Sequence, residues 1–233
     1  MIDMRKKISL ACRILCMEGF EDFSLGHISC RIPDQKNSFF IKPSGLGLGE
    51  TKPGDLIVVD LEGNKLRGKY GSPAETAIHT EIYKIRSDVQ SIVHVHPIIS
   101  TAFTSTRVKI KPLNQDGVLF FRGVPRFESA ELIVTKKQGK ALAQELGKGT
   151  AVFLQNHGVV TVGESIESAC LNALFLERAL KVQLIASLFG KPKPIPPKSG
   201  LKMYAMLSQN RERYENMWRY LVRKLKRKGL DFG

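Results

Sequence analysis

Apolar residues recur at two different spacings along this chain, and the changes between them predict where helices and strands lie. Residues 4–18 carry apolar side chains three or four positions apart, which is the spacing of one helix face, and Gly19 is a typical helix end. Residues 39–42 and 55–60 are short runs rich in β-branched and aromatic side chains. A turn sequence at residues 62–64 follows the second run, so we expect a β-hairpin there.

The segment Ser72-Pro73-Ala74-Glu75 has the sequence of a helix start. Serine suits the N-cap, proline suits the first helical position, and a glutamate three residues after the cap completes a capping box. We therefore expect a helix from this segment to about Ser87, followed by a strand over residues 91–96 that Pro97 ends. In this interpretation Glu75 could serve only to cap the helix.

The C-terminal half predicts two more helices and two β-runs. Residues 130–146 have helical spacing. Residues 151–155 and 158–162 are apolar β-runs that could pair with each other or form one bulged strand. Ser165 then begins the longest helix, whose broad apolar face continues until shortly before Pro192.

Composition indicates one main domain with a basic extension. The chain of 233 residues can bury one sizeable core, and its 42% hydrophobic and 25% charged residues are ordinary for a globular protein. We expect a main domain over residues 1–190, a proline-rich linker over 191–200 and a basic helical extension over 201–233. The extension holds nine Lys/Arg and three Asp/Glu, and so contributes +6 to the formal net charge of +14. Its amphipathic helix predicts a solvated basic face, an edge for an anionic substrate, or a subunit contact.

The sequence argues against several classes of protein. No run approaches the roughly 18 apolar residues that cross a bilayer, and charge interrupts the first apolar stretch too early for a signal peptide. We therefore expect no membrane partner. The four cysteines form no C-x-x-C pair, which favours reduced thiols and a cytoplasmic location. Nucleic-acid binding by the basic helix is an alternative that we do not favour, because the excess charge is partly a property of the tail.

Three of the histidines have the placement of metal ligands. In Val93-His94-Val95-His96-Pro97, the alternation of side chains along a strand puts both imidazoles on one face, although such a pair also occurs in cores and on surfaces. His157 lies between two apolar runs, where a bend can project a third ligand, and Gly158 permits close backbone approach. Three neutral imidazoles leave an open coordination position, as a catalytic metal site requires.

Further polar groups lie near these histidines in the predicted pattern. Glu75 is the natural fourth group of the site, and His79, one helical turn later, could support Glu75 or simply cover the core. Lys42-Pro43-Ser44-Gly45 follows a strand and could cradle an anionic group. Gly26-His27-Ile28-Ser29, shortly before Arg31, adds polar groups that packing alone does not explain.

Taken in chain order, these segments resemble the class II aldolase/adducin family from about residue 5 to residue 190. The resemblance implies a three-layer α/β/α sandwich with a central, mainly antiparallel sheet, commonly assembled as a homotetramer. It implies that His94, His96 and His157 bind zinc or a similar divalent ion such as manganese, cobalt or iron. It also implies that Glu75 is an acid/base group close to the metal.

Some positions depart from the sugar-phosphate aldolases of the family. An asparagine and two serines that hold the phosphate in those enzymes are replaced here by His27, Pro73 and Ala74, although Ser44 and Gly45 remain. The tyrosine that transfers a proton to or from the leaving aldehyde in those aldolases would fall near Gln115, where this chain has no tyrosine. The G-H-I-S, H-x-H-P and N-Q-D segments are more similar to decarboxylase-type members, which act on carboxylated aromatic or ring-derived substrates.

The resemblance therefore implies a divalent-metal-dependent carbon–carbon lyase that stabilises an enolate intermediate. We slightly prefer a decarboxylase acting on a small anionic hydroxy-carboxylate to a sugar-phosphate aldolase or an epimerase. His27, Ser29, Ser44 and Gly45 are expected to orient this substrate, and Lys42 and Arg31 to contact its carboxylate, with arginine the better clamp. A non-enzymatic, adducin-like interaction module is the alternative from another class, and the retention of all three histidines argues against it.

Overall fold

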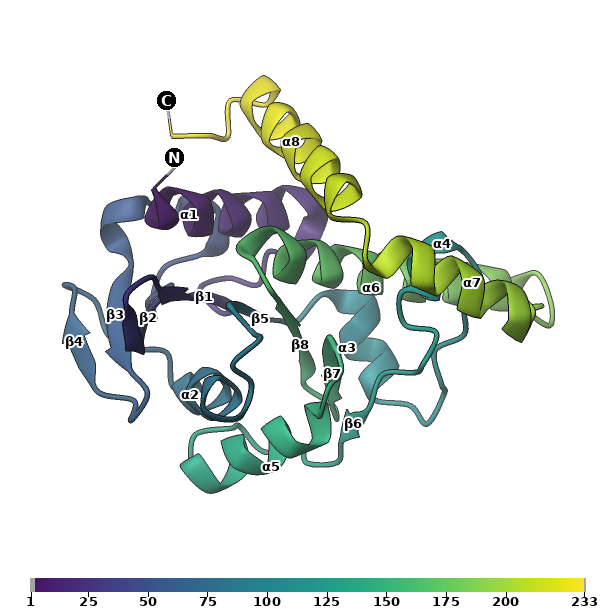
Figure 1. The fold of residues 1–233 in the computed structure, drawn as a ribbon, viewed down its shortest axis with the longest axis horizontal. Coiled ribbons are helices and arrows are strands. Elements are labelled where there is room, and N and C mark those ends of the chain that lie inside the picture. Colours follow the sequence, from purple (N-terminus) through teal and green to yellow (C-terminus); the bar gives the residue numbers. More distant parts are fainter. Residues whose placement is uncertain (1–2, 233) are drawn as a thin grey trace.

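The computed structural model describes residues 3–232, and these form one eight-stranded sheet covered on both faces by helices (Figure 1). Residues 1 and 2 of the predicted main domain and residue 233 of the predicted extension lie outside the described residues. The order across the sheet is β4-β3-β2-β1-β5-β8-β7-β6, and neighbours are antiparallel except for the parallel pair β6 and β7. The strands are β1 (His27–Ile32), β2 (Gln35–Ile41), β3 (Ile57–Asp60), β4 (Lys65–Arg67), β5 (Ser91–Val95), β6 (Arg126–Phe127), β7 (Ala151–Leu154) and β8 (Gly158–Gly163).

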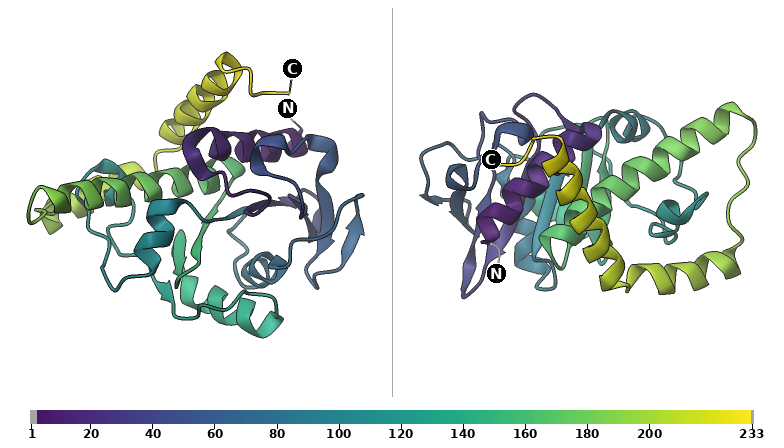
Figure 2. Two further views of the ribbon diagram at one scale, coloured as in Figure 1. Left: turned by 180° about the vertical axis from the view of Figure 1, so that it is seen from behind. Right: turned by 90° about the horizontal axis from the view of Figure 1, so that it is seen from above.

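The helices form the two outer layers, which confirms the predicted α/β/α sandwich. α1, α6 and α8 pack on one face of the sheet, and α2 and α5 cover the other (Figures 1 and 2). None of the helices within residues 3–232 combines the length and apolar character that a membrane crossing requires. The helices are α1 (Met4–Leu15), α2 (Thr76–Ile85), α3 (Ile98–Thr104), α4 (Gln115–Val118), α5 (Lys136–Leu146), α6 (Ile166–Leu188), α7 (Pro197–Ser208) and α8 (Arg211–Arg227).

The strand β5 lies near the middle of the sheet and separates the two cores. All of its residues are buried. Val93 and Val95 belong to the core under α1 and α6, whereas Ile92 belongs to the core under α2 and α5. Because side chains alternate along a strand, His94 projects to the same face as Ile92, toward α2.

Several predicted elements are confirmed. The N-terminal helix is α1, and the chain leaves it through a π-turn over Cys16–Phe20 in which Gly19 has φ +88°, a conformation that favours glycine. The hairpin at residues 62–64 joins β3 to β4. The two β-runs near His157 are paired antiparallel strands, β7 and β8, which decides between the two alternatives.

The structure also contains elements that were not predicted and helices that begin at other residues than predicted. β1 was not predicted, because its polar residues His27, Ser29 and Arg31 alternate with Ile28 and Cys30 and obscure a half-polar strand that is interior to the sheet. α3 was likewise not predicted. α5 begins at Lys136, not at residue 130, because Thr135 and Gln138 form the actual capping box. α7 begins at Pro197, inside the predicted linker.

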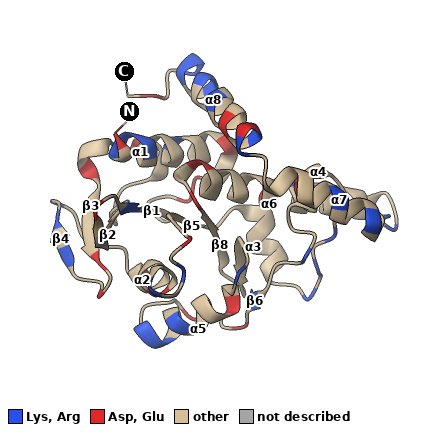
Figure 3. Ribbon diagram, viewed as in Figure 1, with Lys and Arg blue, Asp and Glu red and all other residues tan. Residues whose placement is uncertain are grey.

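The basic C-terminal helix α8 packs on α1 and α6 (Figure 2). Trp218, Leu221 and Leu225 are buried in the same core as α1, whereas Lys and Arg gather on exposed positions toward the end of the helix (Figure 3). At its start, the Tyr214 hydroxyl lies 3.1 Å from the Asn172 side-chain oxygen of α6. The apolar side of α8 is thus part of the core, and its charge faces away from it.

We predict that Leu225→Ala lowers the free energy of unfolding by about 2–5 kcal/mol, because it leaves a cavity where a fully buried side chain was. Urea denaturation measures this change. Leu201→Ala in α7 is the matched control, because the same atoms are removed from a side chain that is 53% exposed. Equal costs for the two substitutions would contradict the packing of α8 into the core.

Candidate metal centre

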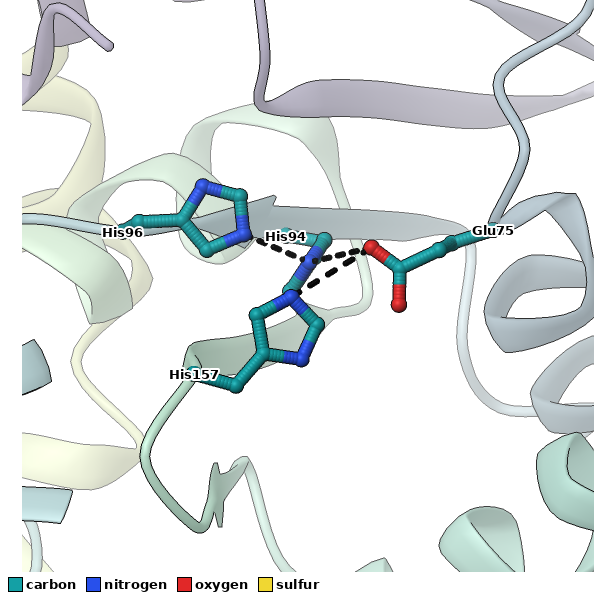
Figure 4. A group of neighbouring side chains, drawn as sticks. All are labelled: Glu75, His94, His96 and His157. Carbon is teal, nitrogen blue, oxygen red and sulfur yellow. Dashed lines mark hydrogen bonds and ion pairs between the residues drawn. The ribbon is translucent and has the colours of Figure 1, made fainter. Parts of the chain in front are cut away.

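Three histidines and one glutamate converge at the end of β5 (Figure 4). His94 Nε2 lies 2.9 Å from His96 Nε2, and Glu75 Oε2 lies 3.4 Å from the Nε2 atoms of both His94 and His157. One ligand atom from each of the four side chains lies within 4.8 Å of all the others. The predicted partners His94, His96, His157 and Glu75 are thus brought together.

The sheet register explains this convergence. Val95 pairs with Val159, so the β7–β8 turn that carries His157 lies beside His96, which follows the end of β5. Gly158 makes this approach possible, because a Cβ atom there would lie 2.5 Å from His96 Cδ2. The close backbone approach predicted for this glycine is confirmed.

Hydrogen bonds to the Nδ1 atoms aim the Nε2 atoms of two ligands. His94 Nδ1 lies 3.1 Å from the Val159 carbonyl oxygen, and His96 Nδ1 forms a short contact with the Asp22 carboxylate. Both partners can only accept, so each imidazole donates its proton there and keeps a bare Nε2 for a metal. His157 Nδ1 is buried without a hydrogen-bond partner among residues 3–232.

Asp22 was not identified from the sequence. It lies 74 residues before His96 in a loop after α1, and nothing in its local sequence indicates a partner. Burial, followed by the charge of His94, lowers the pKa of His96 to about 4, although the Asp22 carboxylate opposes this shift. His96 is therefore neutral near pH 7, as a metal ligand must be.

Glu75 does not have the capping role that its sequence allowed. α2 begins at Thr76, and Glu75 makes no cap hydrogen bond. Its Oε1 atom instead accepts the backbone N–H of Ile133 at 2.8 Å, which leaves Oε2 directed at the histidines. Burial raises the pKa of Glu75, but the proximity of His157 and His94, together with the hydrogen bond from the Ile133 N–H, outweighs burial and lowers this pKa.

The four side chains fit a divalent ion. Zinc bound to nitrogen and oxygen at about 2.0–2.2 Å with tetrahedral angles would separate neighbouring ligand atoms by about 3.3 Å. The separations of 2.9 and 3.4 Å are close to this value. Three imidazoles and one carboxylate also match the ligand preference of zinc and related ions.

A pocket of about 590 Å³ opens beside the four ligands. Four of the predicted substrate-binding residues line it, namely His27, Lys42, Ser44 and Gly45. Lys42 is buried, and its Nζ atom donates to the carbonyl oxygens of Ser24 and Pro43 at 3.1 and 3.2 Å. Burial lowers the pKa of this lysine. The rest of the wall includes apolar side chains, among them Leu25, Pro43, Pro73, Ala74 and Leu132.

Three other predicted site residues lie outside this pocket. The Arg31 guanidinium stacks on the Tyr83 ring and donates to backbone carbonyls of residues 83, 86 and 89, so it is removed from the candidate substrate contacts. Ser29 is fully buried behind His27 and does not reach the pocket. The ring nitrogens of His79 contact His27 and Ser29 of β1, so neither is left for Glu75.

The position expected for the aldolase tyrosine also lies outside this pocket. Gln115 begins the short helix α4 and does not line the pocket. Its neighbour Asp116 accepts a hydrogen bond from Arg178 of α6 at 3.0 Å. Within the described chain this segment therefore attaches α4 to α6.

Known proteins share both the sequence pattern and the fold. The family model "Class II Aldolase and Adducin N-terminal domain" matches residues 6–184. A 3,4-dihydroxyphthalate decarboxylase from Arthrobacter keyseri is 32% identical over 206 residues, which cover 82% of each chain. An L-fuculose phosphate aldolase from Methanocaldococcus jannaschii is 30% identical over 189 residues, covering 80% of this chain and 99% of the relative. The solved structure of an L-fuculose 1-phosphate aldolase from Glaciozyma antarctica matches with a TM-score of 0.88 at 29% identity, covering 98% of this chain and 91% of the other.

We predict that Asp22→Ala weakens binding of Zn²⁺ by about 10–100-fold, because His96 loses the acceptor that orients its ring. Competition with a chromogenic chelator measures the dissociation constant. Glu21→Ala removes the same charge from the neighbouring exposed residue and should leave Zn²⁺ affinity nearly unchanged. If both variants weakened binding equally, overall charge and not ring orientation would be the cause.

Proposed function

The chain belongs to the class II aldolase and adducin family, and on this basis we propose that it is a divalent-metal-dependent carbon–carbon lyase. The observation that carries the proposal is the convergence of His94, His96, His157 and Glu75 beside one pocket, which all of them except His94 line. Zinc is the expected ion, with manganese, cobalt or iron as alternatives. A bound ion supplies a Lewis acid, which stabilises the negative charge that develops on a substrate oxygen when the bond breaks.

Glu75 is proposed to move a proton at Oε2. Its Oε1 atom is engaged by the Ile133 N–H, whereas Oε2 faces the histidines and the pocket. Because Oε1 is already hydrogen-bonded, Oε2 is the atom that could accept a proton from a substrate hydroxyl in the pocket. Its proximity to the ligands also allows it to bind the resting ion.

The pocket wall supports a decarboxylase acting on a small hydroxy-carboxylate. Pro73 and Ala74 offer no side-chain donors to a phosphate, and the apolar groups around them suit a ring. Lys42 can hold an anionic group through the donor hydrogen that its two carbonyl partners leave free. The decarboxylase relative from Arthrobacter keyseri acts, by its name, on a dihydroxylated aromatic dicarboxylate, which agrees with this substrate class.

Aldol cleavage of a sugar phosphate is the second candidate. Ser44 and Gly45 line the pocket and could contact part of a phosphate, and fuculose-phosphate aldolases are among the relatives. An epimerase would use the same metal site. A non-enzymatic, adducin-like module is disfavoured, because it would have no use for three aligned ligands and a buried carboxylate. We further propose a homotetramer and, from the four free cysteines, a cytoplasmic location.

A substrate screen tests the proposal. Zn²⁺-loaded protein is incubated with 3,4-dihydroxyphthalate, other hydroxybenzoates and L-fuculose 1-phosphate, and released CO₂ and aldehyde are measured in parallel. We expect CO₂ from a hydroxy-carboxylate, and we expect His96→Ala to remain folded while losing both stoichiometric metal and turnover. Turnover by metal-free His96→Ala would reject the metal-dependent mechanism, and aldehyde release alone would favour the aldolase.

A second substitution separates proton transfer from folding. We predict that Glu75→Gln keeps the fold, because the amide oxygen can still accept the Ile133 N–H, but lowers kcat by about 10²–10⁴-fold, because the proton acceptor is lost. Circular dichroism, metal content and initial rates measure the three properties. Full activity in this variant would reduce Glu75 to a structural residue.

A further inference from the structure

A chain of buried side chains runs from the pocket wall into the core beneath α2. His27 Nδ1 lies 2.7 Å from His79 Nε2, His79 Nδ1 lies 2.6 Å from Ser29 Oγ, and Ser29 Oγ lies 2.8 Å from the Tyr83 hydroxyl. Ser29 and His79 are fully buried, and Tyr83 is 2% exposed. His27 alone among the four lines the pocket, and the antiparallel register pairs it directly with the metal ligand His94.

The direction of the hydrogen bonds in this chain follows from its buried end. The Tyr83 hydroxyl has two possible acceptors, Ser29 Oγ at 2.8 Å and the Gln90 carbonyl oxygen at 3.3 Å. The first distance is ordinary for a hydrogen bond between oxygens, and the second is long. The Gln90 carbonyl oxygen also accepts the backbone N–H of Arg31 at 3.0 Å, so it has a partner without the Tyr83 hydroxyl. Tyr83 therefore donates to Ser29.

Each later bond is then determined in turn. Ser29 accepts from Tyr83 and has one proton left, which it donates to His79 Nδ1. A neutral His79 must then carry its proton on Nε2 and donate it to His27 Nδ1. A neutral His27 carries its own proton on Nε2. Both rings are buried, and burial without a neighbouring anion in hydrogen-bond contact favours the neutral form of an imidazole.

We propose that Tyr83, Ser29 and His79 are positioning residues that hold His27 in a single tautomer, with a donor N–H on Nε2 directed at the pocket. The metal ligands provide the contrast. His94 and His96 give their Nδ1 protons to acceptors and keep a bare Nε2, whereas the Nδ1 atom of His27 faces a donor. The same residue type thus supplies ligands at two positions and a hydrogen-bond donor at a third.

This tautomer has two consequences beside the metal. The ring centroids of His27 and His94 are only 5.0 Å apart, and a protonated Nε2 cannot bind a metal, so His27 stays out of the ligand set. An N–H directed at the pocket also suits an acceptor-only group such as a carboxylate. This second consequence rests on the proposed function, because it assumes that an anionic substrate occupies the pocket.

Nitrogen-15 NMR of the Zn²⁺-loaded full chain, labelled at histidine, tests the proposal, because the two neutral tautomers have different ring-nitrogen shifts. The His27 signals are assigned by their loss in His27→Asn. We expect wild-type His27 to be protonated on Nε2. We expect Ser29→Ala to give a mixture of tautomers, because it removes the hydroxyl that connects Tyr83 to His79. Tyr83→Phe, the more conservative change, should give a smaller shift in the same direction.

The control is Tyr214→Phe, which removes a hydroxyl from another hydrogen-bonded tyrosine outside this chain of residues and should leave the His27 tautomer unchanged. Protonation of wild-type His27 on Nδ1 would overturn the proposal. It would equally be overturned if His27 stayed protonated on Nε2 in both Ser29→Ala and Tyr83→Phe.

Binding of salicylate, a hydroxy-carboxylate probe, separates this proposal from the proposed function. We expect its dissociation constant to rise about tenfold in Ser29→Ala, as loss of one hydrogen bond to a charged group implies. The expected wild-type tautomer together with no binding of salicylate would support the chain of positioning residues and contradict the hydroxy-carboxylate substrate. Equal salicylate affinity in wild type and Ser29→Ala would show that the donor N–H does not contact the carboxylate.

Discussion

Backbone hydrogen bonds hold β5 between β1 and β8, and the register of these two pairings places the groups of the candidate site. On one side the pairing sets His27 opposite His94. On the other side it brings the β7–β8 turn to the end of β5, so that His157 reaches His94 and His96. A slip of one residue in either pairing would turn these side chains to the opposite face. The two helical layers bury both faces of the sheet and so exclude such a slip.

Polar groups buried beside this sheet need partners, and the partners divide the histidines into two kinds. A buried imidazole without hydrogen bonds is costly, so each ring nitrogen that faces the core has strong reason to find a donor or an acceptor. A carbonyl and a carboxylate face His94 and His96, and these acceptors free a lone pair on the other nitrogen. The hydroxyls of Ser29 and Tyr83 have the opposite effect. Ser29 donates to His79, His79 donates to His27 Nδ1, and the proton of His27 therefore stays on Nε2. The surroundings of each ring, and not the residue type, decide its role.

The helices and the segments before them contribute to the site to different degrees. α2 supplies the His79 and Tyr83 side chains from its buried face, and the turn before it supplies Glu75. The segment before α5 supplies the backbone N–H of Ile133, which orients Glu75. α8 lies on the opposite face of the sheet with α1 and α6, where its buried side chains complete the core and its basic residues face outward. The basic residues of α8 are thus separate from the pocket.

The sequence by itself was enough to predict the layered fold, through its resemblance to a family, and to single out three histidines as candidate metal ligands with Glu75 beside them. Spacing alone placed His94 and His96 together, since alternation along a strand is a property of neighbouring residues. The tertiary structure alone decided that Asp22 orients His96, that Glu75 binds the Ile133 N–H instead of capping α2, and that Arg31 faces away from the pocket. It also decided that Ser29 and His79 lie behind His27. Each of these contacts joins residues from different elements, many positions apart, and no local pattern encodes the packing that brings them within hydrogen-bonding distance.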